Sequence, residues 1–220
     1  ITGGGGVLCS GFAKDLASFG VKVAVLDLRE DAAQKVVDEI NADGGTALAV
    51  GCNVLEAESL ENARQKINST LGTCDILING AGGNDPMATT DCETYDQVTA
   101  DAPDKKSFFD ISKDAFSRVF GLNLLGTLLP TQVFACDMTA GGGTIINVSS
   151  MNAFCPLTKI PAYSAAKAAV SNFTQWLAVH FANTGIRVNA IAPGVVHTDM
   201  VEKLGEETNA VLHSGIARKS

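Results

Sequence analysis

Ile1-Thr2-Gly3-Gly4-Gly5-Gly6 opens the chain and says more about its fold than any other stretch. Two β-branched residues that lead into a run of glycines are typical of a strand ending in a tight turn, and a helix is expected to begin near Ser10. Glycine allows a positive φ and a close approach of the backbone to a ligand, while the first amides of a helix attract an anion. Because no Gly-Lys-Ser/Thr follows, the turn is not a P-loop. It suits a pyrophosphate, and a flexible turn is the alternative.

The next apolar run ends at Asp27, roughly 20 residues after the glycines, where a carboxylate accepts hydrogen bonds from an adenosine ribose. A carboxylate there also repels a 2′-phosphate and favours NAD over NADP, although Arg29 weakens this preference. Capping of a helix is the alternative role for Asp27. Asn53 and then Asn79-Gly80-Ala81-Gly82 follow later apolar runs, at strand ends where an extended dinucleotide would lie.

Short β-branched runs alternate with helical segments along the chain. The runs are Val21–Leu26, Thr46–Cys52, Asp75–Ile78, Thr144–Val148 and Ile186–Ile191, and the clearest helical periodicity is in Asp31–Ala42 and Glu56–Leu71. Strands that are apolar on both faces and separated by helices indicate a parallel sheet covered on both sides. We therefore predict an α/β fold, a doubly wound parallel sheet (Rossmann fold) with three layers, α/β/α, in one domain over residues 1–220. The domain is expected to be truncated at both ends, since Ile1 falls at the end of a strand and Ser220 before a final one.

Residues 84–112 interrupt this alternation. They are polar and acidic, contain Pro86 and Pro103, and show little periodicity. Long irregular insertions in compact domains are often lids or binding loops, and sometimes disordered. We predict a substrate lid here, with disorder as the open alternative.

The composition excludes several classes of protein. A chain of 220 residues with 46% hydrophobic and 18% charged residues is globular rather than disordered. Its net charge of −8 offers no basic surface for nucleic acid or an anionic membrane, and no apolar stretch is expected to reach the length of a membrane span. The six cysteines lack metal-binding spacing and several lie in apolar runs, so we expect buried thiols in a reducing, cytoplasmic compartment and no metal site.

Tyr163 and Lys167 stand four residues apart, which places them on one face of a helix. A nearby ammonium favours the phenolate, so Lys167 is expected to lower the pKa of Tyr163 from its usual value of about 10. Such a tyrosine can exchange a proton with an alcohol or a carbonyl. Ser150 lies thirteen residues upstream, at the end of an apolar run. Taken alone, the pair could also be surface decoration.

In combination these motifs resemble the short-chain dehydrogenase/reductase family, over nearly the whole chain. The matching elements, in family order, are Thr2-Gly3, Asp27, Asn79-x-Ala81-Gly82, Asn123, Ser150, Tyr163-x3-Lys167 and Pro193-Gly194-x3-Thr198. The resemblance implies that Ser150 polarises the substrate oxygen and that Tyr163 moves its proton. Lys167 would then support Tyr163 and bind the nicotinamide ribose, and Asn123 would hold a water-linked proton relay. The implied cofactor contacts are Gly3, Gly6, Val7, Leu8, Asp27, Leu28, Asn53, Val54, Asn79, Ala81, Gly82, Tyr163, Lys167, Pro193, Val196 and Thr198.

Two motifs depart from the usual family pattern. Thr-Gly-x3-Gly-x-Gly becomes a run in which Val7 and Cys9 occupy the second and third glycine positions, and a glycine appears one residue early, at Gly6. In Asn-Asn-Ala-Gly, the second asparagine is replaced by Gly80. The detailed phosphate contacts are therefore open.

Three further stretches, Gly82-Gly83-Asn84, Ser149–Phe154 and Leu157–Tyr163, are similar to the branch of D-mannonate oxidoreductases or D-fructuronate reductases. That similarity implies reversible hydride transfer between a nicotinamide and one secondary alcohol carbon of a sugar acid. The implied substrate contacts are Asn84, Ser150, Met151, Asn152 and Tyr163, with Lys159 either a further contact or a solvated loop residue. Another polyol, a gluconate-type acid, a steroid or an acyl carbonyl remains open as substrate. A dinucleotide-binding sensor without catalysis is also open, but the intact catalytic residues disfavour it.

Two segments, Phe116–Val133 and Ala168–Phe181, are apolar around much of the helical circumference. Such helices need more than one burial partner. Together with the family resemblance, this favours a homodimer or homotetramer, with burial inside one chain as the alternative.

Overall fold

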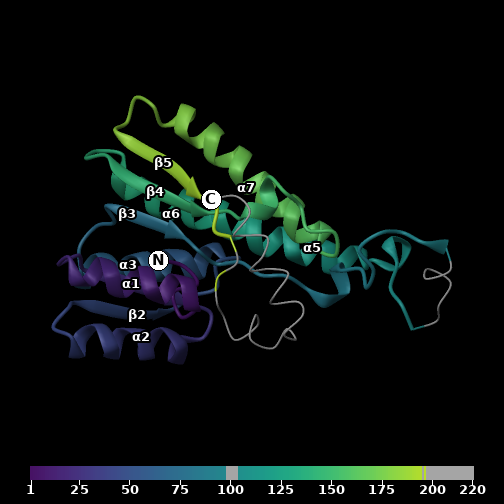
Figure 1. The fold of residues 1–220 in the computed structure, drawn as a ribbon. Coiled ribbons are helices and arrows are strands. Elements are labelled where there is room, and N and C mark those ends of the chain that lie inside the picture. Colours follow the sequence, from purple (N-terminus) through teal and green to yellow (C-terminus); the bar gives the residue numbers. More distant parts are fainter. Residues whose placement is uncertain (98–103, 195, 197–220) are drawn as a thin grey trace, which may run out of the picture.

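The computed structural model describes residues 1–97, 104–194 and 196, and it has the predicted three-layer α/β architecture (Figure 1). The strands are β1 (Val23–Asp27), β2 (Ala47–Gly51), β3 (Ile76–Asn79), β4 (Gly143–Val148) and β5 (Ile186–Ile191). β1 pairs with β2, β3 with β4, and β4 with β5, each in parallel register. The predicted strands are thus confirmed, with ends that differ by at most two residues.

Thr2 joins the two halves of the sheet. It forms parallel bridges with Leu26 on one side and Asn79 on the other, so the order across the sheet is β2, β1, Thr2, β3, β4, β5. The chain therefore winds outward from Thr2 in one direction and then in the other. The carboxyl ends of the strands beside such a switch point are where open α/β sheets bind ligands.

Helices cover both faces of the sheet, as the alternation of side chains along β1 requires. Val23 and Val25 pack with α1 (Val7–Ser18) and α2 (Glu30–Ala42). Leu26 faces the other way, into a core built with α3 (Ala57–Thr70), α6 (Gly126–Met138) and α7 (Pro161–His180). This second core carries the helices that lead to the predicted catalytic residues.

The first helix begins earlier than predicted. α1 begins at Val7, directly after the glycine run, and not near Ser10. Gly6 is its N-cap, with extended backbone dihedrals of φ −78° and ψ 159°. The glycines therefore lead into the helix without an intervening segment, and the uncapped first turn lies at the end of the sheet where a ligand is expected.

One helical run corrects the expectation about membrane-length stretches. α5 (Lys113–Phe120), a π-helical turn (Gly121–Leu125) and α6 form a continuous run over Lys113–Met138. Its length of 26 residues, and the mean hydropathy of 1.5 over its most apolar stretch, are those of a membrane span. Phe134 and Met138 are nevertheless buried in the core against the sheet, so burial inside the domain accounts for the apolar composition of α6.

The described parts of the insertion, residues 84–97 and 104–112, extend from the body of the domain as the teal segments between β3 and α5 in Figure 1. It contains two short 3₁₀ turns, η1 (Pro86–Ala88) and η2 (Phe108–Asp110). Its base is anchored, because Ser112 N–H donates to Met87 O at 3.1 Å and Asp85 accepts from Arg118 at 2.8 Å. The described parts of this segment are thus largely irregular, as their low sequence periodicity indicates.

The cysteines are less buried than expected. Cys9 and Cys52 are buried, whereas Cys136 and Cys155 are exposed and the remaining two are intermediate. All six fall within the described ranges, and none of them forms a disulfide there.

Candidate active site

Ser150, Tyr163 and Lys167 come from two neighbouring elements. β4 ends at Val148, and Ser150 then caps the 3₁₀ turn η4 (Met151–Ala153) by accepting a hydrogen bond from Asn152 N–H at 3.2 Å. Tyr163 lies in the first turn of α7, with Lys167 one turn later. The end of a strand and the start of a helix thus hold the three side chains in one place.

Lys167 is buried, with 4% of its surface exposed. Its Nζ donates to the Val148 carbonyl at 2.7 Å and lies 5.6 Å from the centroid of the Tyr163 ring. Burial disfavours the ammonium and lowers the pKa of Lys167 from 10.5 to about 8. A lysine in this state is charged at neutral pH but loses its proton under mildly alkaline conditions.

The prediction that Lys167 lowers the pKa of Tyr163 is wrong for this structure. Burial of the phenol raises its pKa above the usual 10, and the interaction with the Ser150 hydroxyl opposes this only in part. The Lys167 ammonium is directed at a backbone carbonyl, which explains why it does not dominate the phenol. Near neutral pH Tyr163 is therefore a protonated phenol beside a serine hydroxyl, which suits it to donate a proton to a carbonyl oxygen.

Asn123 lies behind this group, fully buried in the π-helical turn. Its Nδ2 donates to Gly83 O at 2.7 Å and to Val119 O at 2.8 Å. A Cβ at Gly82 would come within 2.6 Å of Asn123 Oδ1 and 3.2 Å of Lys167 Nζ. Asn123, Lys167 and the loop after β3 therefore meet at one point, as the motif predicted.

The glycine-rich turn is organised around Asp27. Gly3 has a positive φ of 63°, and Gly5 N–H donates to Asp27 Oδ2 at 3.0 Å. Arg29 N–H donates to the other carboxylate oxygen at 3.1 Å, while Leu28 is exposed beside it. The cap of α2 is Arg29 and not Asp27, so the capping alternative for Asp27 is not what the structure shows.

The residues at this end of the sheet fit a dinucleotide. No side chain in the described part of the chain caps the first turn of α1, so the amides that follow Gly6, at Val7 and Leu8, are available to a pyrophosphate. Asp27 offers carboxylate oxygens at the adjacent strand end. Gly3 cannot carry a side chain, because a Cβ there would lie 2.9 Å from the backbone of Ala81.

Three of the predicted cofactor residues have side chains engaged elsewhere. Asn53 forms a local turn before α3, accepting from Leu55 N–H and donating to Glu56. Val54 is buried. The Asn79 side chain is directed into the core, where its Nδ2 donates to Thr131 and to Asn147 at 2.9 Å each. Any contact of Asn79 with a dinucleotide is therefore restricted to its backbone.

The loop after β5 lies beside η4. Pro193 O accepts a hydrogen bond from Met151 N–H at 3.0 Å, and Val196 is partly buried. Thr198, predicted to orient the nicotinamide carboxamide, lies outside the described residues.

The predicted substrate residues differ in their surroundings. Asn152 is buried, with 6% exposed, and its Oδ1 has no hydrogen-bond partner among the described residues. Met151 is partly buried, whereas Asn84 and Lys159 are exposed. Asn152 is thus the substrate candidate whose side chain most needs a partner.

Two contributions were not predicted from the sequence. The Val148 carbonyl holds Lys167, and Gly83 bonds to Asn123 through its carbonyl. Both residues act through their backbone carbonyls, so their side-chain types could not have indicated these contacts.

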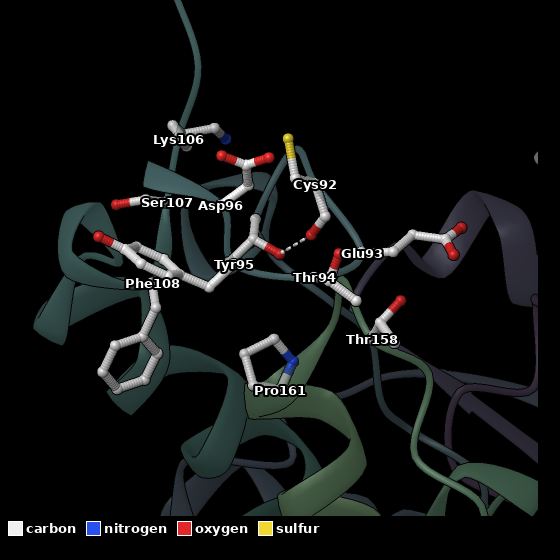
Figure 2. A pocket seen from close by; sticks show the side chains of 11 residues that line it. Cys92, Glu93, Thr94, Tyr95, Asp96, Lys106, Ser107, Phe108, Thr158 and Pro161 are labelled. Atoms are coloured by element: carbon white, nitrogen blue, oxygen red, sulfur yellow. Dashed lines mark hydrogen bonds between the residues drawn. The ribbon is translucent and has the colours of Figure 1, made fainter. Parts of the chain in front are cut away.

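A small cavity of about 160 Å³ lies in the insertion, close to the start of α7 (Figure 2). Tyr95 and Phe108 line it from the insertion, and Thr158 and Pro161 line it from the loop that leads into α7. Thr90 N–H donates to Lys159 O at 3.0 Å, which ties the two sides together. The insertion is therefore bound to the segment that immediately precedes Tyr163.

Comparison with known proteins adds to this geometry. Residues 1–209 match the family model of the short chain dehydrogenases. An uncharacterized oxidoreductase of Haemophilus influenzae is 60% identical over 195 residues, which span 88% of this chain and 68% of that protein. The 7α-hydroxysteroid dehydrogenase of Escherichia coli is 33% identical over 205 residues, 93% of this chain and 72% of that protein.

A solved structure is similar throughout. It is of a Haemophilus influenzae protein provisionally described as a D-mannonate oxidoreductase, with bound NAD. The TM-score is 0.91 at 53% identity, and the match covers 96% of this chain and 78% of that one. The fold and the order of the strands around the candidate site are thus shared with a protein that binds a dinucleotide.

Proposed function

The chain belongs to the short-chain dehydrogenase family, and from that premise we propose that it transfers a hydride between NAD and one secondary alcohol carbon of a sugar acid. The proposed substrate pair is D-mannonate and D-fructuronate. As a family member the protein is an oxidoreductase that acts on CH–OH groups of small molecules. The sugar acid and the cofactor are the proposed parts.

NAD is supported by the residues at the switch point of the sheet. The carboxylate of Asp27 suits the adenosine ribose and disfavours the 2′-phosphate of NADP. The amides after Gly6 suit the pyrophosphate, and Lys167 together with the backbone of Ala81 and Gly82 would hold the nicotinamide ribose. Bound there, the dinucleotide supplies or accepts the hydride.

The protein's own groups would then handle the proton. Ser150 holds the substrate oxygen by a hydrogen bond, and Tyr163 gives a proton to that oxygen in reduction or takes it in oxidation. Because burial raises the pKa of Tyr163, its protonated form predominates at neutral pH. Reduction is therefore favoured near neutrality, and oxidation is expected to accelerate as the pH rises.

The observation that carries the choice of substrate is the unpartnered Oδ1 of Asn152. Leaving a buried acceptor unpaired costs about 1–3 kcal/mol, which a substrate hydroxyl could recover. Asn152 follows Ser150 by two residues, and its N–H bonds to the Ser150 hydroxyl. A simple alcohol uses its one oxygen between Ser150 and Tyr163. A sugar acid has a further hydroxyl on the neighbouring carbon for Asn152.

The insertion 84–112 is proposed as the lid over this substrate. Ala88 at its base packs in one cluster with Ala115 of α5 and Ala162 of α7, and Tyr163 lies against the same cluster. The base is thus fixed while its more distant part carries exposed Tyr95 and Phe109. A fixed base with an exposed tip is the form that a lid requires.

A homodimer or homotetramer in a reducing, cytoplasmic location completes the proposal. The outer face of α7 exposes Trp176 and Val179, and Trp176 stacks on His180 with ring centroids 4.6 Å apart. Exposed apolar side chains of this size mark a surface that a second subunit can cover. All six cysteines are free thiols in the described structure, and Cys136 is an exposed one, which agrees with a reducing compartment.

The proposed function is tested by following the absorbance of reduced nicotinamide across aldonates, uronates and polyols, with cyclohexanol as the single-hydroxyl control. Tyr163→Phe should abolish turnover and leave NAD binding nearly intact. Asn152→Leu should lower kcat/KM for D-mannonate by about tenfold, the equivalent of about 1.4 kcal/mol. Turnover that survives in Tyr163→Phe, or an equal loss on every alcohol in Asn152→Leu, would contradict the proposed roles.

A further inference from the structure

We propose that Cys9 and Gly80 act as one packing unit, in which the Cys9 thiol occupies the space of a side chain at position 80 and sets the position of residues 80–83 for the cofactor. This inference rests on the proposed NAD site. Both residues stand at positions where the chain departs from the usual family pattern, as Val7 does too. Neither departure was explained by the sequence.

The contact is close and confined. A Cβ built on Gly80 would lie 2.1 Å from Cys9 Sγ, well inside any allowed contact, and 2.9 Å from Thr2 O. Cys9 is only 4% exposed, so its sulfur has little room in which to move aside. Burial also raises the pKa of the thiol, so Cys9 remains neutral and acts here by its volume. The Cβ of Cys9, by contrast, would lie 3.7 Å from a Cβ at position 80, which is an ordinary van der Waals distance.

Residues 80–83 connect the glycine-rich turn to the catalytic group. Gly80 and Ala81 N–H both donate to Thr2 Oγ1, at 3.1 Å and 3.2 Å. At the other end, Gly83 bonds to Asn123, and Gly82 has no space for a Cβ beside Lys167. A side chain at position 80 would therefore displace a segment that contacts both ends of the dinucleotide site.

The geometry makes the two substitutions reciprocal. With a glycine at position 9, the sulfur is absent, and the Cβ of a residue at position 80 has the Thr2 carbonyl as its remaining close neighbour, at 2.9 Å. With cysteine at position 9, the space is filled from α1, and only glycine fits at position 80. Overpacking a filled site usually costs about 1–3 kcal/mol. A side chain at position 80 is therefore expected to destabilise the protein more when position 9 is cysteine than when it is a smaller residue.

The test compares Gly80→Ala, Cys9→Ala and the double variant with the original chain. Each is measured for thermal unfolding without NAD and for NAD affinity by calorimetry. Gly80→Ala should weaken NAD binding by about tenfold or more and lower Tm, since the overpacking displaces residues 80–83. The double variant should recover part of both, because the 2.1 Å contact with the sulfur is gone and the new methyl then meets the Cβ at position 9 at 3.7 Å and the Thr2 carbonyl at 2.9 Å. Gly11→Ala is the matched control, since a Cβ there meets nothing within 4 Å among the described residues.

A double variant no better than Gly80→Ala would overturn the pairing. A loss of Tm without a loss of NAD affinity would overturn the role in cofactor binding. If the original chain binds no NAD while the double variant still rescues Tm, the cofactor proposal fails and the packing pair stands without its cofactor role.

Discussion

Replacement of Lys167 by methionine should make the protein's stability respond differently to pH. Lys167 is the one catalytic candidate whose charge is buried, and burial lowers its pKa to about 8. The unfolded chain has the ordinary value of 10.5 and so binds more protons than the folded chain between these two values. Stability therefore rises with pH across that window. Below about pH 8 the full cost of burying the ammonium is present.

The size of the effect follows from linkage. With pKa values of 8 folded and 10.5 unfolded, the buried ammonium destabilises the folded state by about 3 kcal/mol at pH 7 and by about 1 kcal/mol at pH 10. Lys167→Met removes this term but leaves the Val148 carbonyl without its donor, which costs about 1–3 kcal/mol at every pH. At pH 7 the variant should thus be at least about as stable as the original chain. Its relative stability should then fall by about 2–3 kcal/mol between pH 7 and pH 10.

The measurement is urea unfolding followed by far-ultraviolet circular dichroism, without NAD, at several pH values over this range. Lys35→Met is the matched control, because Lys35 is exposed on α2 and its removal should leave the difference in stability flat. Turnover should be lost in Lys167→Met at every pH. If the free energies of the original chain and Lys167→Met run parallel from pH 7 to pH 10, Lys167 does not carry the shifted pKa and the reasoning fails.

Two further predictions concern the cofactor and the core. Asp27→Ala should relax the preference for NAD, because it removes the carboxylate that repels a 2′-phosphate, and an unchanged ratio of NAD to NADP activity would remove Asp27 from the ribose. Asp137→Ala should cost about 2–4 kcal/mol in urea unfolding, because it leaves Arg64 and Asn68 of α3 without the 3% exposed carboxylate that they share. Exposed Glu39→Ala is the control, and an equal loss in both variants would contradict the assignment.

The fold was predictable because its signals are local. Most strands are short runs rich in β-branched residues, and the glycines after Thr2 mark the switch point of the sheet. The sequence predicts that α1 begins near Ser10, whereas it begins at Val7. A run of glycines lowers helix propensity but does not show where helical hydrogen bonding begins. The membrane-length run was overlooked because Lys113 and Arg118 interrupt its apolar residues at one end.

The sequence motifs predicted which candidate residues lie close together, but not their electrostatics. The motifs predict that Ser150, Tyr163 and Lys167 lie close together, and in the structure Tyr163 lies beside both Ser150 and Lys167. The direction of the Tyr163 pKa shift depends on how deeply the phenol is buried and on where the Lys167 ammonium points. Neither quantity is encoded in a four-residue spacing. The same holds for Asn79, whose motif position said nothing about the core partners of its side chain.

A polar seam between β4 and α7 explains how the catalytic residues keep their places. Asn147 donates to Thr174 Oγ1 at 2.9 Å, and the Ser149 and Ser171 hydroxyls lie 2.6 Å apart. Ser149 Oγ also donates to the carbonyl of Lys167 at 3.1 Å. On α7 these contacts fall at positions three to four residues apart, which is one face of the helix.

The seam joins the strand that leads to Ser150 directly to the helix that begins before Tyr163. The loop between them, residues 151–160, is exposed over residues 154–159, with Phe154 on the surface, while its two ends are bonded to Pro193 and Thr90. The buried hydrogen bonds of the seam fix the register between β4 and α7, because such bonds are costly to break in the interior. The core therefore helps to set the distance from Ser150 to Tyr163, independently of the exposed residues 154–159.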